Sequence, residues 1–358
     1  MLRIYLMNKK KAGAGVRRAG LQGFFGVALA VVFALPPGDG GLLTASGVPT
    51  GTGTGLNATL ASGRGPAPAS ELSHLRNQAA PCGYLRGRPK VDQVMLVWEE
   101  NHAYSSIIGN PAAPEINRLA SECGLATNYY SIGHPSLPNY LAMTSGLPYA
   151  SWPWTTDCDP QGGCVTGAAS IFSELAEKGR QWRSYAESMG ASCGLASYGT
   201  YAAKHNPAVY YTMARADCRR WDQPMGTPSR GALRAELRRG PTVALTTLSP
   251  NVDDDMHDGT VGQADSWLAS WLPQVVSSPA YRSGRLAVVV VWDEGTGSGA
   301  TEQSHVPLVV MSASTPRGAR SAAFLDDYSV LHVICQLTGV PQLNQAARAP
   351  SFVSSFHL

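Results

Sequence analysis

The sequence has little charge and lacks long apolar runs, and these two shortages exclude several classes of protein. Charged residues make up 15% of the 358 residues, against about 25% in an average globular protein, which excludes a highly charged disordered chain. No apolar run reaches the roughly 18 residues that a membrane span requires. The 38 glycines and 25 prolines follow no collagen period, and neither a heptad pattern nor an internal repeat persists. We therefore expect a globular protein with one large core.

The excess of basic over acidic residues comes from the start of the chain. Six Lys and Arg residues lie within residues 1–46, opposed there only by Asp39. Because this segment carries a net charge of +5, the formal charge of +3 for the whole chain becomes −2 for the remainder. A remainder with this balance offers nucleic acid no general electrostatic attraction, and we predict no nucleic-acid partner.

The order of features near the N-terminus is typical of a secretory signal peptide. After the basic start comes an apolar run, 21–35, followed by the small residues Thr44, Ala45 and Ser46. The run is short for a membrane span, so we predict a signal peptide over 1–46, with the Sec and Tat routes both open. Residues 47–85 are predicted to be a flexible linker rich in Gly, Ser, Thr and Pro, and 86–358 a single folded domain. The protein is expected to be secreted, without a stable transmembrane helix after processing.

The sequence also lacks any Cys-x-x-Cys pair, which argues against a zinc site built from cysteines. Seven cysteines follow the predicted signal peptide, and an exported protein can form disulfides. Spacing alone leaves the connectivity open. The pairs that we expect are Cys158–Cys164, Cys193–Cys218 and Cys82–Cys123, with Cys335 as a buried free thiol.

Apolar strands that alternate with helical patterns favour an α/β fold. The predicted strands are 93–98, 182–186, 242–248, 286–292 and 308–311, and the predicted helices are 114–123, 139–144, 168–178, 263–276 and 328–337. Continuous apolar strands of this kind are typical of a mostly parallel sheet that helices cover on both faces.

Carboxylates and imidazoles gather where these strands end. Glu100 and Asn101 follow the first strand, Asp253 and His257 follow 242–248, and Asp293 and Glu294 follow 286–292, while His305 precedes 308–311. In such a sheet ligands bind beyond the carboxyl ends of the strands. Like charges that meet there repel unless a cation lies among them, and this donor set suits Zn, Mn, Mg or Ca. Each cluster alone could be a solvated turn, a loop cap or a core histidine; their shared position favours a divalent metal site.

The segment from Gly133 to Tyr140 (GHPSLPNY) places a serine at the entrance of a helix. Free backbone N–H groups and the helix dipole favour an anion at this point. Ser136 could simply be an N-cap. It could also act as a nucleophile on a phosphoryl group if a metal lowers the pKa of its hydroxyl, with Asn139 one turn further along the helix.

These segments together resemble a known family. VWEENHAYSSIIGN, GHPSLPNYLAMTSG, DDDMHDGT and VVVVWDEG are similar to motifs of the phosphoesterase family of bacterial acid phosphatases and phospholipases C, in the alkaline-phosphatase-like superfamily. Their order most resembles that of secreted actinobacterial acid phosphatases, including phosphatidylinositol 3-phosphatases. The resemblance covers about 91–339. It implies a three-layer α/β/α sandwich and metal-dependent hydrolysis of phosphate esters.

The resemblance also implies roles for individual residues. Ser136 matches the nucleophile that forms a phosphoserine, Asn139 the residue that steadies the transition-state oxygens, and His134 lies beside the phosphate. The implied metal ligands are Glu100, Asn101, Asp253, His257, Asp293, Glu294 and His305. The late pair is usually Asp-His and the first ligand usually Asp, so Asp293-Glu294 and Glu100 leave the metal's identity and number open. Asp254, Asp255 and Asp258 compete with Asp253 as ligands.

The function that we expect is that of a secreted acid phosphatase acting on phosphoric monoesters, phosphoinositides among them. The first alternative is a phosphodiesterase or phospholipase C on lipid headgroups; aromatic residues of the 150–167 loop could form an apolar wall for a lipid, or simply pack around a disulfide. A further alternative is an exported protein that binds phosphate or metal without turnover. The absence of a Cys-x-Pro-x-Arg element argues against a sulfatase.

Overall fold

The computed structural model describes residues 81–149, 156–296 and 301–358. The predicted signal peptide, the linker up to residue 80 and the tryptophans of the 150–155 segment lie outside the described residues, and those interpretations stay predictions. At the start of the described part, Cys82 is buried, and it forms a disulfide with Cys123.

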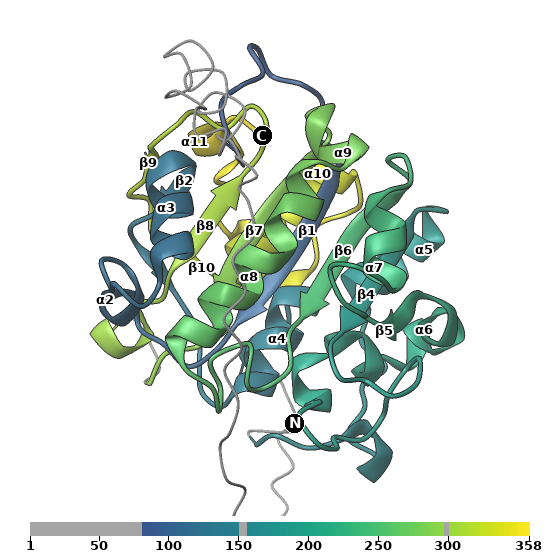
Figure 1. Cartoon of the computed structure of the whole chain (residues 1–358). Coiled ribbons are helices and arrows are strands. Elements are labelled where there is room, and N and C mark those ends of the chain that lie inside the picture. The colour runs from purple at the N-terminus through teal and green to yellow at the C-terminus, as the bar shows by residue number, and fades with distance from the viewer. Residues whose placement is uncertain (1–80, 150–155, 297–300) are drawn as a thin grey trace, which may run out of the picture. The chain divides into compact units, whose positions relative to one another are not determined.

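An eight-stranded sheet runs through the centre of the described part (Figure 1). Its strands, in spatial order, are β5 (Asp222–Pro224), β4 (Gln181–Ala186), β6 (Val243–Ser249), β1 (Gln93–Glu99), β7 (Leu286–Trp292), β8 (Leu308–Met311), β2 (Gly124–Ala126) and β9 (Ala319–Ser321). The five strands from β5 to β7 are mutually parallel, and β8 runs antiparallel to both of its neighbours. A separate parallel pair joins β3 (Tyr129–Tyr130) to β10 (Leu325–Asp326). The mostly parallel sheet predicted from the sequence is confirmed.

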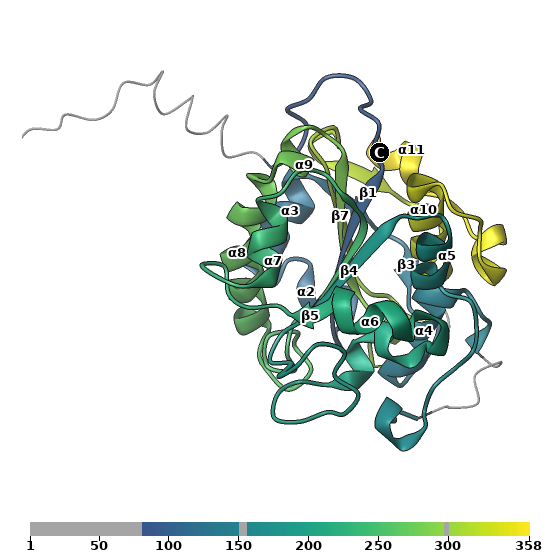
Figure 2. The same ribbon diagram turned by 90° about the vertical axis from the view of Figure 1, so that its right-hand side faces the viewer.

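Helices cover both faces of this sheet, which gives three layers (Figure 2). On one face lie α3 (Pro114–Glu122), α7 (Ala232–Leu237), α8 (Val261–Val276) and α9 (Pro279–Arg282). On the other lie α4 (Ser136–Ser145), α5 (Ile171–Glu177), α6 (Arg215–Trp221) and α10 (Asp327–Thr338). The short helices α2 (Tyr104–Ile107) and α11 (Val353–Phe356) complete the set in the described residues. Because both faces are covered, every residue of β1, β6 and β7 is buried.

The helix that carries the serine motif is buried along its whole length. α4 follows Pro135, which is its N-cap residue and makes no side-chain cap bond, and it ends at Gly146, whose φ is +71°. Ser136 is thus the first residue inside the helix rather than its N-cap. The alternative that Ser136 is only an N-cap is therefore wrong, and its hydroxyl can face other groups.

All three expected disulfides form: Cys82–Cys123, Cys158–Cys164 and Cys193–Cys218. Cys335 is a buried free cysteine, as the apolar sequence around it predicts. No helix in the described ranges is both long and apolar enough to cross a membrane.

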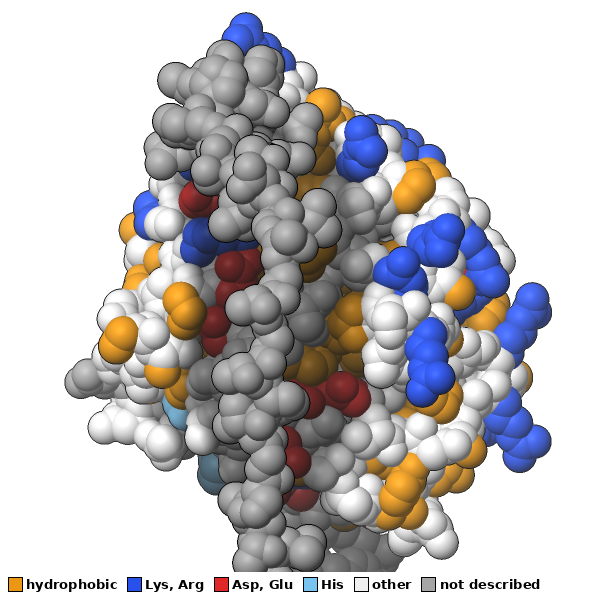
Figure 3. Space-filling model, viewed as in Figure 1, with side chains coloured by type: hydrophobic (Ala, Val, Ile, Leu, Met, Phe, Trp, Pro, Cys, Tyr) orange, Lys and Arg blue, Asp and Glu red, His pale blue; other side chains and the backbone are white. Residues whose placement is uncertain are grey.

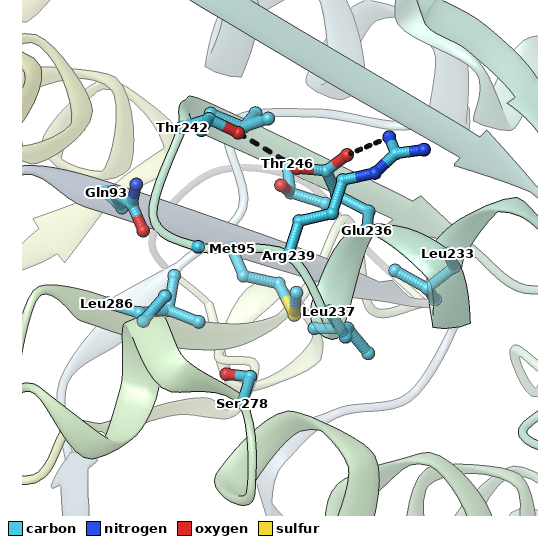
Figure 4. Close-up of a pocket in the computed structure, with 13 residues that line it drawn as sticks. Gln93, Met95, Leu233, Glu236, Leu237, Arg239, Thr242, Thr246, Ser278 and Leu286 are labelled. Atoms are coloured by element: carbon cyan, nitrogen blue, oxygen red, sulfur yellow. Dashed lines mark hydrogen bonds and ion pairs between the residues drawn. The ribbon is translucent and has the colours of Figure 1, made fainter.

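A small pocket of about 30 Å³ opens at the end of the sheet where the parallel strands begin (Figure 4). Gln93 and Leu286, the first residues of β1 and β7, line it together with Thr242, which precedes β6. Beside it Arg239 forms an ion pair with Glu236. The carboxylates and imidazoles predicted to form the site follow these strands at the opposite end.

Candidate active site

Three buried carboxylates meet beyond the carboxyl ends of the two central strands. Glu100 follows β1, and Asp293 and Glu294 follow β7; each is at most 1% exposed. Each offers an oxygen, and these oxygens all lie within 4.8 Å of one another. β1 and β7 pair in parallel up to Glu99 and Trp292, which brings the residues that follow them to the same edge. The sequence prediction that these strand ends converge is confirmed by this register.

The electrostatics of this first trio favour a cation. Burial, followed by the charges of Glu100 and Glu294, raises the pKa of Asp293 well above its usual range. Burial and the charge of Glu100 likewise raise the pKa of Glu294 to about 9. Neither carboxylate oxygen of Asp293 has a hydrogen-bond partner within the described residues. Buried carboxylates without partners are costly, and a divalent ion among these oxygens would satisfy them; the donor set therefore fits a metal.

A second trio shares Glu100 with two histidines. The ligand atoms of Glu100, His205 and His257 also lie within 4.8 Å of one another. His205 Nε2 lies 2.9 Å from Glu100 Oε1, and its Nδ1 lies 2.8 Å from Asp255 Oδ2. Burial lowers the pKa of His205, but the two carboxylates outweigh burial and raise it to about 10. Two groups of potential ligands, joined at Glu100, therefore lie side by side.

Ser136 faces the first trio from the N-terminus of α4. Its hydroxyl is buried and lies 3.1 Å from Glu100 Oε2 and 3.2 Å from Glu294 Oε1, to either of which it can donate. Tyr140, one turn further along α4, donates from its hydroxyl to Glu100 Oε1 at 2.7 Å. A hydroxyl held against two carboxylates is positioned to lose its proton when it attacks an electrophile.

Asn139 and His134 lie beside this serine. The amide nitrogen of Asn139 donates to the Gly133 carbonyl at 3.0 Å and lies 3.3 Å from Glu294 Oε2. Its amide oxygen is buried without a partner in the described part of the chain. His134 is more exposed, and its Nδ1 lies 2.9 Å from Glu294 Oε2. All three residues predicted for catalysis thus contact the carboxylate trio or its immediate neighbours.

The remaining three predicted ligands lie outside both trios. Asn101 follows Glu100 with a φ of +53°. Asp253 is partly exposed, whereas Asp255, two residues on, is buried against His205. The ring of His305 stacks on Tyr104 with ring centroids 4.4 Å apart. Their assignment as ligands stays a prediction.

The sequence interpretation omitted a charged group that the fold brings to this edge. Lys204 and His205 come from η3, a 3₁₀ helix (Ala203–His205) in the connection from β4 to β5. Lys204 Nζ lies 2.7 Å from Asp157 Oδ2 and 2.9 Å from His257 Nε2. Burial lowers the pKa of Lys204, but the hydrogen bond and charge of Asp157 outweigh burial and raise it.

A sequence signal for these residues did exist. The connection that carries Lys204 and His205 follows the predicted strand 182–186, and in a parallel sheet the residues beyond a strand's carboxyl end face the ligand site. No carboxylate cluster marks this connection, and the two residues lie 18 and 19 positions beyond the end of β4 at Ala186.

The fold and the site together define a three-layer α/β enzyme in which a helix-borne serine faces buried carboxylates, with histidines beside them, at the carboxyl ends of the parallel strands. Residues 110–341 match the Phosphoesterase family, and the chain belongs to that family. A phosphatidylinositol-3-phosphatase of Mycobacterium tuberculosis is 31% identical over 267 residues, which cover 73% of this chain and 82% of that protein. A phosphate-repressible acid phosphatase of Penicillium chrysogenum is 25% identical over 318 residues, covering 86% of this chain and 71% of that protein.

Among solved structures, a protein in the alkaline phosphatase superfamily from Vibrio parahaemolyticus matches with a TM-score of 0.49 and 13% identity, over 75% of this chain and 72% of that one. The family resemblance stated from the motifs is confirmed by the family match and by the relatives. The protein is accordingly a phosphoric ester hydrolase of the acid-phosphatase type.

Proposed function

We propose that this protein is a secreted, metal-dependent phosphoric monoester hydrolase in which Ser136 is the nucleophile. The observation that carries the proposal is the place of Ser136, whose Oγ lies 3.1 and 3.2 Å from the carboxylates of Glu100 and Glu294 at the N-terminus of a ten-residue helix. Backbone N–H groups at this helix end favour a phosphoryl group. A hydroxyl that also contacts two buried carboxylates suits a nucleophile that must lose its proton.

The metal in this proposal is held by the first trio, Glu100, Asp293 and Glu294, and a second ion could be held by Glu100 and His205, while His257 contacts Lys204. A bound divalent ion would supply the positive charge that neutralises these carboxylates and lowers the pKa of the serine hydroxyl. The partnerless oxygens of Asp293 support this assignment. The identity of the ion is open among Zn, Ca, Mg and Mn.

The chain's own residues then perform two displacements. Ser136 Oγ, after losing its proton to solvent, forms a bond to phosphorus as the bond to the leaving oxygen breaks, and the protonated His134 imidazolium gives a proton to the leaving group. Water next attacks the phosphoserine and breaks the Oγ–P bond. In this step His134 takes a proton from water, and Ser136 Oγ leaves as the alkoxide. Asn139 lies close enough to orient the phosphoryl oxygens.

Secretion and the substrate class also belong to this proposal. Three disulfides in the described part support an oxidising compartment, and the predicted signal peptide over 1–46 supplies the route. The relative named as a phosphatidylinositol-3-phosphatase supports phosphoinositides as one group of candidate substrates. The catalytic domain is proposed to span 86–358.

The test compares release of nitrophenol from p-nitrophenyl phosphate and from bis(p-nitrophenyl) phosphate by the purified protein and by Ser136→Ala. We expect monoester turnover that requires a divalent metal and falls at least about 10³-fold in the variant, more than the loss of a single electrostatic stabiliser. Preference for the diester would indicate a phospholipase C type of enzyme instead.

Ser145→Ala is the matched control for this test. Ser145 ends the same helix and is also buried; its hydroxyl donates to the Leu141 carbonyl and accepts from the Leu147 N–H, away from the carboxylate trio. Its loss leaves the carboxylate trio intact, so turnover should stay within about threefold of the unmodified protein. Full activity in Ser136→Ala would refute the nucleophile assignment.

A further inference from the structure

Lys204 is the one Lys or Arg side chain that forms an ion pair at the site, within the residues that the structure describes. Its charge lies close enough to interact with Glu100 and Asp293. Many of the exposed cations lie elsewhere: Figure 3 shows several Lys and Arg side chains on the right-hand side, which in Figure 1 is the side of α6 and α7. Exposed arginines of this region include Arg219, Arg220, Arg230, Arg238 and Arg239.

Asp157 links Lys204 to the N-terminus of α4. One oxygen of its carboxylate, Oδ1, accepts from the backbone N–H of Leu137 at 3.1 Å, and the other, Oδ2, accepts from Lys204 Nζ at 2.7 Å. Leu137 directly follows Ser136. A single anionic group can therefore contact the N–H of the second helix residue and the ammonium of Lys204 at the same time.

The phosphoryl group of a substrate is an anion that the same two donors could bind. When Ser136 attacks phosphorus, the phosphoryl oxygens lie beside the helix N-terminus, where the Leu137 N–H points. The carboxylate of Asp157 already satisfies these donors in the substrate-free protein. This carboxylate is negatively charged and has two oxygens where a phosphoryl group has three. It therefore resembles part of a phosphate.

We propose that Lys204 binds a non-bridging phosphoryl oxygen of the substrate, in place of the Asp157 carboxylate, and thereby selects monoesters over diesters. This inference rests on the proposed function. A phosphate monoester carries about two negative charges above pH 6, whereas a diester carries one. A cation placed beside the phosphoryl group stabilises the dianion more, in a site whose other fixed charges are mostly carboxylates.

His257 fixes Lys204 for this role. Its Nε2 accepts from Lys204 Nζ, and its Nδ1 lies 2.8 Å from Asp258 Oδ1. With Nε2 as the acceptor, the ring proton is on Nδ1 and is donated to Asp258. The ammonium is thus held from two sides, by an imidazole and by a carboxylate.

The experiment measures kcat/KM on both nitrophenyl substrates for the full protein and for Lys204→Met. We expect the monoester value to fall about 10²-fold, and the diester value by no more than about tenfold. An equal fall on both substrates, or no fall on either, would overturn the inference. Lys178→Met is the matched control, because Lys178 is exposed at the end of α5 and contacts no residue of the site.

A binding measurement keeps the test independent of turnover. In a Ser136→Ala background, calorimetric titration with inorganic phosphate should show affinity at least about tenfold weaker with Lys204→Met. Lys204→Arg, which keeps the charge if the Met variant folds poorly, should retain at least about a third of the affinity. An arginine variant as weak as the methionine one would contradict a role for the charge.

Asp157→Asn separates substrate binding from mere structural support. If phosphate displaces Asp157, removing its negative charge should leave phosphate affinity equal or higher; a loss as large as that in Lys204→Met would refute displacement. The proposed function fails separately, when Ser136→Ala keeps its activity. The Lys204 inference fails alone when Ser136→Ala is inactive but Lys204→Met keeps the monoester preference.

Discussion

At the scale of single residues, two aspartates that lie two positions apart after β6 differ in burial and in contacts. Asp255 is buried, and its two oxygens hold both histidines of the second trio: Oδ2 contacts His205 Nδ1, and Oδ1 accepts from the His257 backbone N–H at 2.8 Å. Asp253 is partly exposed and lies outside the two trios. Asp255 therefore orients the ring of His205 and holds the backbone of His257.

We expect Asp255→Asn to lower kcat/KM on p-nitrophenyl phosphate by about 10- to 100-fold, the usual cost of losing a carboxylate that orients a ligating histidine. Asp253→Asn, the matched control, should stay within about threefold. Steady-state kinetics, together with calorimetric titration of the metal into the metal-free protein, measure both effects. A larger loss in Asp253→Asn would instead support Asp253 as a direct ligand.

Residues that follow a strand directly could be predicted from the sequence as site residues, whereas residues in loops could not. Glu100, Asp293 and Glu294 were identifiable because each directly follows an apolar strand whose ends the pattern defines. The family resemblance favoured Asp253 over Asp255 as a ligand, and this choice stays a prediction, because no period fixes which side chain of a loop turns inward. Lys204 and His205 were missed for the same reason, since tertiary packing alone brings a long connection back to the site.

At the scale of elements, the helix that presents Ser136 depends on how it ends. Gly146 closes α4 with a φ of +71°, and a Cβ at this position would collide with the backbone carbonyl of Leu343. The Leu343 segment packs here through backbone bonds such as Gln345 N–H to Gly146 O, at 2.8 Å. The position of the nucleophile is thus connected to the C-terminal segment.

Gly146→Ala is expected to lower the free energy of unfolding by more than about 1 kcal/mol, because backbone strain and a collision with backbone act together. Gly179→Ala is the control: Gly179 has a φ of +67°, but nothing lies within 4 Å of the Cβ that the substitution adds. It should therefore show the strain alone. Urea denaturation measures both; equal losses would mean that the Leu343 segment moves aside at little cost.

The elements themselves were more predictable than the site. Apolar runs such as 286–292 matched β7 residue for residue, because a strand buried on both faces must be apolar throughout. The serine helix was predicted over 139–144 but begins at Ser136. Prolines at 135 and 138 masked this start, although proline is compatible with the first turn of a helix.

At the scale of the whole molecule, buried acids make folding depend on pH. Asp222, the first residue of the edge strand β5, is fully buried and accepts from the amide of Asn206 at 3.0 and 3.1 Å. Asn206 follows His205 and also accepts from the Ser184 hydroxyl. Asp222 thus joins the sheet edge to the connection that carries the site's histidine and lysine. Burial raises the pKa of Asp222 to about 7, although hydrogen bonds from Asn206 and Ser184 oppose the rise.

The sign of the pH dependence follows from this rise. Because the folded protein holds the proton on Asp222 more tightly than the unfolded chain does, the stabilisation is complete below about pH 4 and is lost as the pH rises through 7. The difference between an unfolded pKa of about 4 and a folded pKa of about 7 corresponds to at most about 4 kcal/mol.

Asp222→Asn cannot ionise, so its free energy of unfolding should fall less than that of the unmodified protein between pH 4.5 and 8. Urea denaturation across this range, with the partly exposed Asp217→Asn on α6 as the control, measures the change. Parallel pH profiles for Asp222→Asn and the unmodified protein would show that Asp222 is ionised in the folded state, and that its hydrogen bonds to Asn206 and Ser184 outweigh its burial.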